Sequence, residues 1–519
     1  MKFWAAAATA SLIALAGCGN NNGFTLVHPM GSYTNASLKG SYVYEVHGTS
    51  TVTFLPYREA GVFTADGAGH ITGGVDDLAG GNGASGSSTS LSGAFSGTYS
   101  VNSDGSGSIF IGPTVLGFIN GASGSQVGFA ITLVSSSKVQ LMEGDAFAVA
   151  AGTAELQDST AIGAIPTGTF AFGVHQEMTA TGGQAPASQV GALTIGGTSG
   201  SGALDQSVGG ILSSSTVTWA FSAPDALGTG TATANSAGNS TPFIYFIVNS
   251  GKFDLLTSNA SAVGSGSAEA QTGSVSGGLS GSYAFGIRGD DATAVQQKFF
   301  GTVATVGIFT ASGGSISGTQ DSNQDGTLTS SAAFPGSCAI PGSAAGISGR
   351  VVVTNGTGTP CTGSTTEIFW MVSPARAFFL DLSPGTFDDG TADLQTTSSF
   401  SNSSMKGQYA LVMDGWDFTG TGVGFPPEPQ AYIGPLQFDG SSKLTFNGLA
   451  NLAASGGGAS AQGGMGGPYS VSTNGRITGT VSNGGNGFDM VMYAISGSRA
   501  YLLQNDSGFV TSGTVELQQ

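Results

Sequence analysis

The chain has 519 residues, of which 88 are glycine and only 8% are charged, and its formal net charge is −18 at pH 7. Its hydrophobic fraction of 39% is too high for a disordered chain, because disordered chains combine low hydrophobicity with high charge. With 13 Lys and Arg residues against 31 Asp and Glu residues, the sequence offers no basic surface for nucleic acid or anionic lipid, and we exclude that class of partner.

The N-terminal segment is "MKFWAAAATASLIALAGC", with one basic residue, Lys2, and an apolar run over residues 3–16. This run is too short to span a bilayer and is typical of a secretory signal peptide. Its end, "LAGC", resembles the lipobox of bacterial lipoproteins. The resemblance implies a signal peptide over residues 1–17, acylation (palmitate) of Cys18 and a tether over residues 18–36. Gly19 after the cysteine favours the outer membrane, either periplasmic or surface-exposed. An ordinary secreted protein with an incidental cysteine is the alternative.

A six-residue motif recurs four times along the chain. Its copies are "GTAELQ" at 152–157, "GSAEAQ" at 266–271, "GTADLQ" at 390–395 and "GTVELQ" at 513–518. Their last residues, which we name the closing glutamines, are Gln157, Gln271, Gln395 and Gln518. These lie 114, 124 and 123 positions apart, which predicts four tandem units of similar length. We place the units at 37–157, 158–272, 273–396 and 397–519.

Each unit also begins alike, with "LKGSYVYEVHG", "IPTGTFAFGVH", "LSGSYAFGIRG" or "MKGQYALVMDG". Alternate residues of a strand point to opposite faces, so the bulky face, such as Tyr42, Tyr44 and Val46, is expected in the core. The opposite face is expected to be exposed to solvent. It ends on an ionisable residue in every unit: His47, His175, Arg288 and Asp414.

Turn residues divide the rest of each unit into hairpins, such as "FTADGAGHITGG" from Phe63 and "FAITLVSSSKVQLM" from Phe129. Adding the closing motif gives about eight antiparallel strands per unit. The sequence therefore predicts an all-β protein of four up-and-down β-barrels, since closure removes the sheet edges. A β-sandwich in each unit is the alternative.

Together the lipobox and the repeated motifs resemble a family of uncharacterised repeat lipoproteins of acidobacterial type. The resemblance implies lipidation and repeat architecture. It carries no activity and no catalytic residue to this chain.

Each final hairpin carries one basic residue, and each closing motif carries one acid 17 positions later. The predicted pairs are Lys138 with Glu155, Lys252 with Glu269, Arg376 with Asp393 and Arg499 with Glu516. We expect each pair to face across adjacent strands on the outer side of its unit, where it fixes the register. The alternative is a repeated solvated face whose charges never meet.

Two cysteines remain besides Cys18, and both lie in the third unit. An even pair in an exported domain predicts a disulfide between Cys338 and Cys361. Two separate buried thiols are the alternative. The spacing is not that of a redox-active CxxC motif.

Neither a metal centre nor a catalytic motif is evident. The four histidines do not form an HExxH pattern, and there is no G-x-S-x-G sequence. Asp76 and Asp77 follow a hairpin and are candidates for a paired-carboxylate site, but we expect them to be loop acids. In "DSNQDGT", Asp321, Asn323 and Asp325 match the first half of a calcium loop, but Ala332 replaces the glutamate that completes such loops. We favour an Asx-rich hairpin turn there.

We therefore predict a lipid-anchored envelope protein with a structural or interaction role, without a cofactor, and with an unidentified protein or glycan partner. A small-ligand-binding barrel is the first alternative, because eight-stranded barrels can hold one ligand. A secreted hydrolase is the second, although we expect the protein not to be an enzyme.

Overall fold

A computed structural model describes residues 33–52, 54–80, 90–113, 127–178, 187–208, 211–258, 262–296, 299–356, 362–383, 386–420, 427–453 and 456–519. The described residues are almost entirely β-strands, apart from turns and short 3-10 helices such as Asn35–Ser37 and Asn402–Ser404. They form four barrels, which confirms the predicted fold class and rules out the sandwich.

Barrels 1 and 2 each close with eight antiparallel strands. Barrel 1 consists of β1 (Lys39–Ser50), β2 (Pro56–Asp66), β3 (His70–Gly80), β4 (Ser90–Val101), β5 (Ser106–Gly112), β6 (Val127–Ser135), β7 (Lys138–Glu143) and β8 (Ala148–Leu156). Barrel 2 consists of β9 (Gly168–Met178), β10 (Ala187–Gly196), β11 (Ser199–Val208), β12 (Ile211–Phe221), β13 (Thr229–Ser236), β14 (Asn239–Asn249), β15 (Lys252–Thr257) and β16 (Ala262–Ala270).

Barrels 3 and 4 follow the same plan. Barrel 3 consists of β17 (Gly281–Gln296), β18 (Phe299–Ser312), β19 (Ser315–Gln324), β20 (Thr327–Ala333), β21 (Cys338–Ala344), β22 (Ile347–Thr354), β23 (Thr365–Ser373), β24 (Arg376–Asp381) and β25 (Thr386–Leu394). Barrel 4 consists of β26 (Lys406–Asp417), β27 (Glu428–Asp439), β28 (Lys443–Leu452), β29 (Ala459–Val471), β30 (Arg476–Asn483), β31 (Asn486–Ser496), β32 (Arg499–Gln504) and β33 (Phe509–Leu517).

Barrel 3 has one strand more than predicted. The pairing of β18 with β19 completes its sheet, while β20 lies on β19 as an additional strand. The turn between β19 and β20 is Asp325-Gly326, with φ of 50° and 81°. Two successive positive φ angles are those of a tight Asp-Gly hairpin turn. The favoured interpretation of "DSNQDGT" as a hairpin turn therefore describes this segment, and the predicted strand count missed the extra hairpin.

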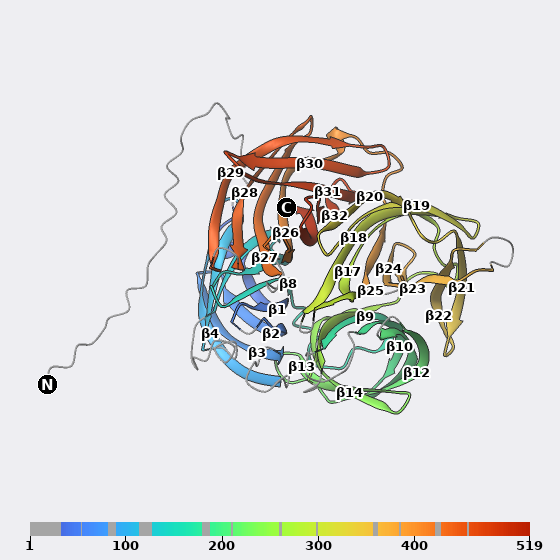
Figure 1. Ribbon diagram of the computed structural model, residues 1–519. Coiled ribbons are helices and arrows are strands. Elements are labelled where there is room, and N and C mark those ends of the chain that lie inside the picture. The colour runs from blue at the N-terminus through green and yellow to red at the C-terminus, as the bar shows by residue number, and fades with distance from the viewer. Residues whose placement is uncertain are drawn as a thin grey trace.

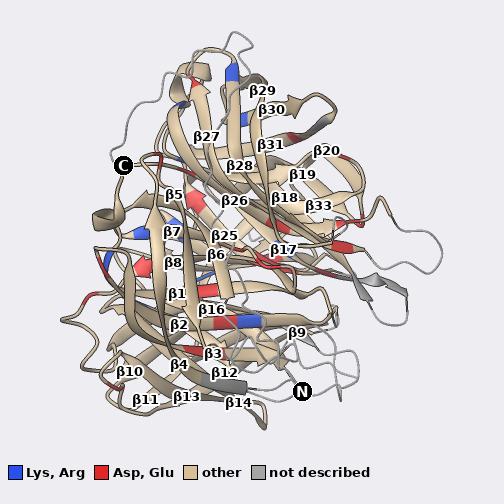
Figure 2. Ribbon diagram, turned by 90° about the vertical axis from the view of Figure 1, so that its left-hand side faces the viewer, with Lys and Arg blue, Asp and Glu red and all other residues tan. Residues whose placement is uncertain are grey.

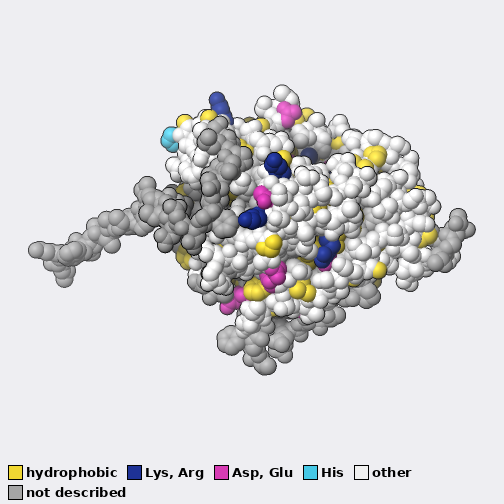
Figure 3. Space-filling model, turned by 90° about the horizontal axis from the view of Figure 1, so that it is seen from above, with side chains coloured by type: hydrophobic (Ala, Val, Ile, Leu, Met, Phe, Trp, Pro, Cys, Tyr) yellow, Lys and Arg dark blue, Asp and Glu magenta, His cyan; other side chains and the backbone are white. Residues whose placement is uncertain are grey.

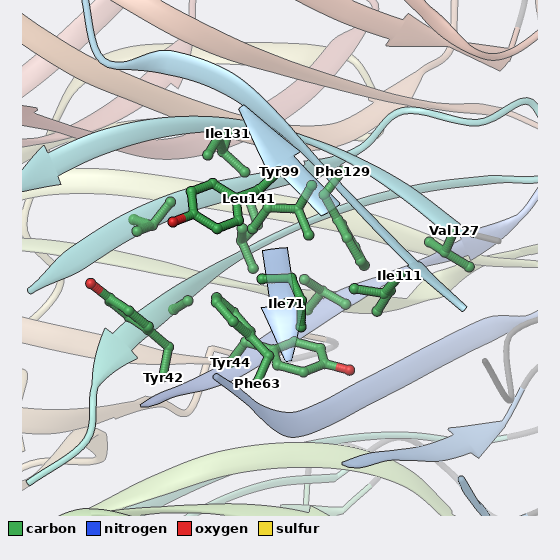
Figure 4. Close-up of a cluster of buried hydrophobic side chains, with 14 of the residues drawn as sticks. Tyr42, Tyr44, Phe63, Ile71, Tyr99, Ile111, Val127, Phe129, Ile131 and Leu141 are labelled. Atoms are coloured by element: carbon green, nitrogen blue, oxygen red, sulfur yellow. The ribbon is translucent and has the colours of Figure 1, made fainter. Parts of the chain in front are cut away.

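Each barrel is filled by its own inward-facing side chains. In barrel 1, Tyr42 stacks on Phe63 with ring centroids 5.3 Å apart, and Tyr44 contacts Phe63 and Phe129. Figure 4 shows these rings and the neighbouring aliphatic side chains pointing toward one another. The other three barrels have comparable cores. The bulky face of each first strand is thus core, as predicted.

The four barrels are arranged in a ring (Figure 1). Going round it, barrel 1 packs on barrel 2, barrel 2 on barrel 3, barrel 3 on barrel 4, and barrel 4 returns to barrel 1. A buried apolar cluster lies at each junction, as with Val43 and Val62 of barrel 1 against Phe246 and Val263 of barrel 2. The expectation that the outer face of the first strands is exposed is therefore wrong, because neighbouring barrels cover it.

Candidate functional site

The closing motif is explained by the contacts between barrels. The closing glutamines each donate through Nε2 to two backbone carbonyls of the next barrel. Gln157 binds the carbonyls of Ile247 (2.7 Å) and Leu227 (2.9 Å), Gln271 those of Met371 (2.8 Å) and Ser348 (3.1 Å), Gln395 those of Ala494 (2.7 Å) and Asn474 (3.0 Å), and Gln518 those of Leu133 (2.7 Å) and Asp104 (3.0 Å). Gln518 thereby joins barrel 4 to barrel 1. We name this junction, which no linker spans, the seam.

The predicted charge pairs lie directly opposite each other on adjacent strands. Lys138 faces Glu155, Lys252 faces Glu269, Arg376 faces Asp393 and Arg499 faces Glu516. In each case, however, the base contacts the acid of the preceding barrel. For two of the four bases this is in addition to the acid of the same barrel. These contacts are Lys138 Nζ to Glu516 Oε1 (2.6 Å), Lys252 Nζ to Glu155 Oε1 (2.6 Å), Arg376 Nε to Glu269 Oε2 (3.0 Å) and Arg499 Nη1 to Asp393 Oδ2 (3.3 Å).

These eight residues, which we name the charge ring, extend around all four barrels: an ion pair crosses every junction, and strand register places a base opposite an acid within each barrel. Within a barrel, Arg376 contacts Asp393 at 2.9 Å and Arg499 lies 3.9 Å from Glu516. Lys138 and Lys252 instead form their ion pairs with the neighbouring barrel, which corrects the predicted partner. Burial raises the pKa of Glu155, but the nearby lysines outweigh it and hold that pKa below its usual value.

A central cavity of about 410 Å³ lies where the four barrels meet, and a smaller compartment of about 130 Å³ adjoins it. Both are lined by the four ionisable residues that end the first strands: His47, His175, Arg288 and Asp414. The exposed fraction of these side chains runs from 16% for His175 to 35% for Arg288. These positions are therefore not solvated strand ends. That expectation is wrong.

The charged groups of the central cavity bind one another across barrel boundaries. Asp414 Oδ1 lies 3.2 Å from His47 Nε2 and 2.7 Å from Arg288 Nη1, so it joins barrels 1, 3 and 4. Burial opposes its ionisation, but these two bases hold the pKa of Asp414 well below its usual value. His175 Nδ1 lies 2.7 Å from Asp389 Oδ1. Burial alone would lower the pKa of His175, but the Asp389 carboxylate reverses this effect and raises it.

The glycine of each closing motif also lines the central cavity: Gly152, Gly266, Gly390 and Gly513. A Cβ on Gly152 would lie 1.9 Å from the carbonyl oxygen of Glu45, and one on Gly513 would lie 2.0 Å from that of Val412. Such distances are sterically impossible, so only glycine allows the first and last strands of each barrel to approach this closely.

The candidate acids of barrel 1 are buried in the sheet. Asp76 and Asp77 lie on β3 and are buried, so they are not loop acids. Inside the barrel, Tyr44 Oη donates to Glu59 Oε1 at 2.7 Å, and Tyr57 Oη donates to Glu143. Burial, with the neighbouring acids, raises the pKa of both glutamates well above the usual range. Their exposure of 0% and 1% leaves no surface for a substrate.

The candidate calcium ligands serve other purposes. Asp321 receives Nε and Nη2 of Arg476 from barrel 4, at 2.8 and 2.7 Å. Asn323 donates to the carbonyl of Phe509, and Asp325 accepts from the Thr302 amide. In the described part of the chain, no group of three or more His, Cys, Asp or Glu side chains is placed to hold a metal ion.

Of the three cysteines, Cys338 lies within the described residues. Cys338 is buried at the start of β21, whereas Cys361 and Cys18 lie outside the described residues. The disulfide and the acylation stay predictions. In the described segments no helix has the length and apolarity needed to cross a bilayer.

A further cavity, of about 420 Å³, lies at the end of barrel 4 where β26 ends at Asp417 and β27 begins at Glu428. Its lining includes Tyr432, Met465 and Phe488 from the barrel core and the acids Asp417 and Glu428.

Comparison with protein-family models gives no match for this chain. Comparison with curated proteins gives no match either.

Proposed function

We propose that this chain is a lipid-anchored protein of the cell envelope, and that it presents a rigid ring of four barrels in a structural or interaction role. The lipobox-like "LAGC" supports the lipid anchor, and the outer membrane is the expected location. The resemblance to repeat lipoproteins belongs to this proposal and rests on the motifs alone.

The observation that carries the interaction role is the closure of the ring through the charge ring and the closing glutamines. Filled barrels whose neighbours are fixed at every junction make a stiff platform, and such scaffolds commonly carry binding residues on their loops. Most of the ribbon in Figure 2 is uncharged. The face in Figure 3 shows charged and hydrophobic side chains scattered singly, a surface suited to polar contacts with a protein or a glycan.

The anchor is tested by Cys18→Ser. We expect this variant to lose incorporation of labelled palmitate and to leave the membrane fraction, because acyl chains hold a protein through their buried methylenes. Cys361→Ser is the matched control, since it removes a different cysteine and should still incorporate the label. Continued labelling of the Cys18→Ser chain would contradict the proposal.

The interaction role is tested with the lipid-free chain from residue 33 onward. Glycan arrays and pull-downs from envelope extracts should give a partner whose binding is lost when surface loops are exchanged and retained when barrel cores are altered conservatively. Turnover of a model ester, peptide or glycoside by the purified chain would favour the hydrolase alternative instead.

The small-ligand alternative keeps one specific support, the cavity of barrel 4. Tyr432→Ala should enlarge that cavity. Binding of an apolar dye that changes with this variant, but not with Tyr42→Ala in barrel 1, would favour that alternative.

A further inference from the structure

The basic residues of the central cavity are balanced by carboxylates. His47 and Arg288 share Asp414, His175 binds Asp389, and Lys252 binds Glu155. The fifth base, Arg58, is 5% exposed; burial raises the pKa of Glu45, but His47 and Arg58 lower it to about 2. The positive charges of this cavity are thus matched by acids of the protein itself.

One further carboxyl, that of Asp254, shares the charge of Lys252 with Glu155. Asp254, on β15, lines the central cavity, and no hydrogen bond or ion pair to it is found among the described residues. Burial raises its pKa to about 7, and the charges of Glu155 and Glu45 add to that effect while Lys252 opposes it. A cation that enters the cavity and donates hydrogen bonds to this buried carboxyl group would stabilise its ionised form.

The rest of the wall suits a cation with a short apolar body. The positions that correspond to Asp254 in the other barrels are Gln140, Phe378 and Tyr501, and all four residues line the cavity. Phe378 and Tyr501 give the wall aromatic surface, and Val306 and Val412 add apolar surface. The net charge of −18 would also draw cations toward the protein.

The repeats differ at these positions, although they agree at the closing motif. A wall with one acid, one amide and two rings has no four-fold symmetry, so it fits an asymmetric molecule better than a symmetric ion on the axis.

We propose that the central cavity binds a small organic molecule through a primary ammonium group, which donates to the carboxylate of Asp254 while its apolar part lies against Phe378 and Tyr501. This site lies between the barrels, and it is separate from the interaction role proposed for the loops.

The experiment is calorimetric titration of the chain from residue 33 onward with butylammonium, and with butyrate, butanol and tetramethylammonium as probes of the same size range. We expect butylammonium to bind and butyrate and butanol not to bind. Asp254→Asn, which keeps the shape of the side chain, should weaken butylammonium binding by at least about tenfold, since it removes a charge-assisted hydrogen bond. Asp225→Asn, on an exposed turn of the same barrel, is the control and should bind like the parent chain.

A second measurement does not depend on a variant. Because the pKa of Asp254 is about 7, ammonium binding at pH 7 should release up to about half a proton, seen as a heat that changes with the ionisation enthalpy of the buffer. Binding of butyrate, unchanged butylammonium affinity in Asp254→Asn, or the absence of butylammonium binding and proton release would each overturn the proposal. Preference for tetramethylammonium over butylammonium would overturn the assignment of a primary ammonium group.

Discussion

The seam and the linked junctions of the ring share one set of contacts, and two of the three linked junctions carry a further one. At every junction a closing glutamine spans two carbonyls, and the next amide bonds a carbonyl of the following barrel: Asp158, Thr272 and Thr396 at the linked junctions and Gln519 at the seam, over 2.8 to 3.0 Å. The seam therefore repeats the contacts that adjacent units make where the chain is continuous. Chain continuity is not what places the barrels; the interfaces do that.

The difference lies in an Arg–Asp pair that two of the three linked junctions carry; at the junction of barrels 1 and 2 the strand register puts Asp77 and Thr229 at these positions. At the junction of barrels 2 and 3, Arg350 binds Asp205 through two nitrogens, and Arg476 binds Asp321 in the same way between barrels 3 and 4. At the seam the strand register puts Leu449 and Ser106 at the corresponding positions.

In addition to the Lys138–Glu516 ion pair, the seam uses neutral side chains. Asn451 donates to three carbonyls of barrel 1, those of Glu143, Asp145 and Ala148, at 2.8 to 3.0 Å. Gln408 donates to the carbonyl of Asp104 at 2.8 Å. The comparison shows that two chemically different sets of contacts give the same geometry.

The largest effect is expected where a buried ion pair is broken. Arg476→Met removes the partner of Asp321, which is 1% exposed, and should lower the free energy of unfolding by about 3 kcal/mol, because a buried charge is left with fewer partners. Arg350→Met should have a similar cost at the junction of barrels 2 and 3. Urea unfolding of both variants measures this. Costs below about 1 kcal/mol would mean that these pairs do not hold the linked junctions.

A smaller effect separates the seam from a linked junction. Gln518→Ala and Gln395→Ala each remove two side-chain hydrogen bonds and should each cost about 1 to 2 kcal/mol. Only Gln518→Ala should let the junction open, because no linker spans the seam. Hydrogen exchange should then accelerate in peptides on both sides of the seam, in barrels 1 and 4. Equal acceleration at the Gln395 junction in Gln395→Ala would contradict the distinction.

The pH dependence of the junction between barrels 2 and 3 should be smaller still. The pKa of His175 is raised by Asp389, against burial, with Arg58 and Asp290 also nearby. A histidine whose pKa is raised in the folded state stabilises the fold. This contribution is complete below the unfolded-state pKa of about 6.5 and is lost as the pH rises through the folded-state pKa. The loss above neutral pH should be about 1 kcal/mol or less, and should vanish in His175→Gln. Melting temperatures from pH 5 to 9 test this, with His70→Gln, an exposed histidine, as the control.

The smallest effect is expected from moving the chain ends. A circular permutant that begins at Asp158, joins Gln519 to Tyr33 through a short Gly-Ser linker and ends at Gln157 turns the seam into a linked junction. Tyr33 Oη lies 2.7 Å from the carbonyl oxygen of Gln519, so a few residues suffice. The melting temperature should stay within about 2 °C, because the interfaces are unchanged. A permutant that fails to assemble would show that continuity between barrels 1 and 2 matters after all.

Much of the fold was predictable because local pattern determines it. Period-2 alternation identified the core face of the first strands, and the constant spacing of Lys138 and Glu155 with their counterparts identified two adjacent strands and their register. Turn chemistry at Asp325 identified a hairpin there.

The central cavity was not predictable for a physical reason. Alternation divides a strand into two faces. A face that packs against a neighbouring barrel has the same sequence pattern as a solvent-exposed face when its residues are small and few of them are ionisable. His47, His175, Arg288 and Asp414 were the visible signal, and they were interpreted as solvated. The closing glutamines were a further signal, because a solvent-exposed strand end does not require glutamine at the same position in all four units. Asp254 and Asp389 stood in no repeated pattern.

The position of Tyr33 has a mechanical consequence. Its hydroxyl bonds the carbonyls of Gln519 and Val134, so the chain enters the ring directly on the seam. A pulling force on the segment that precedes Tyr33 would act first on the junction that no peptide bond spans. Such a load would separate barrel 1 from barrel 4 before it stretched any linker, so the ring would open at the seam.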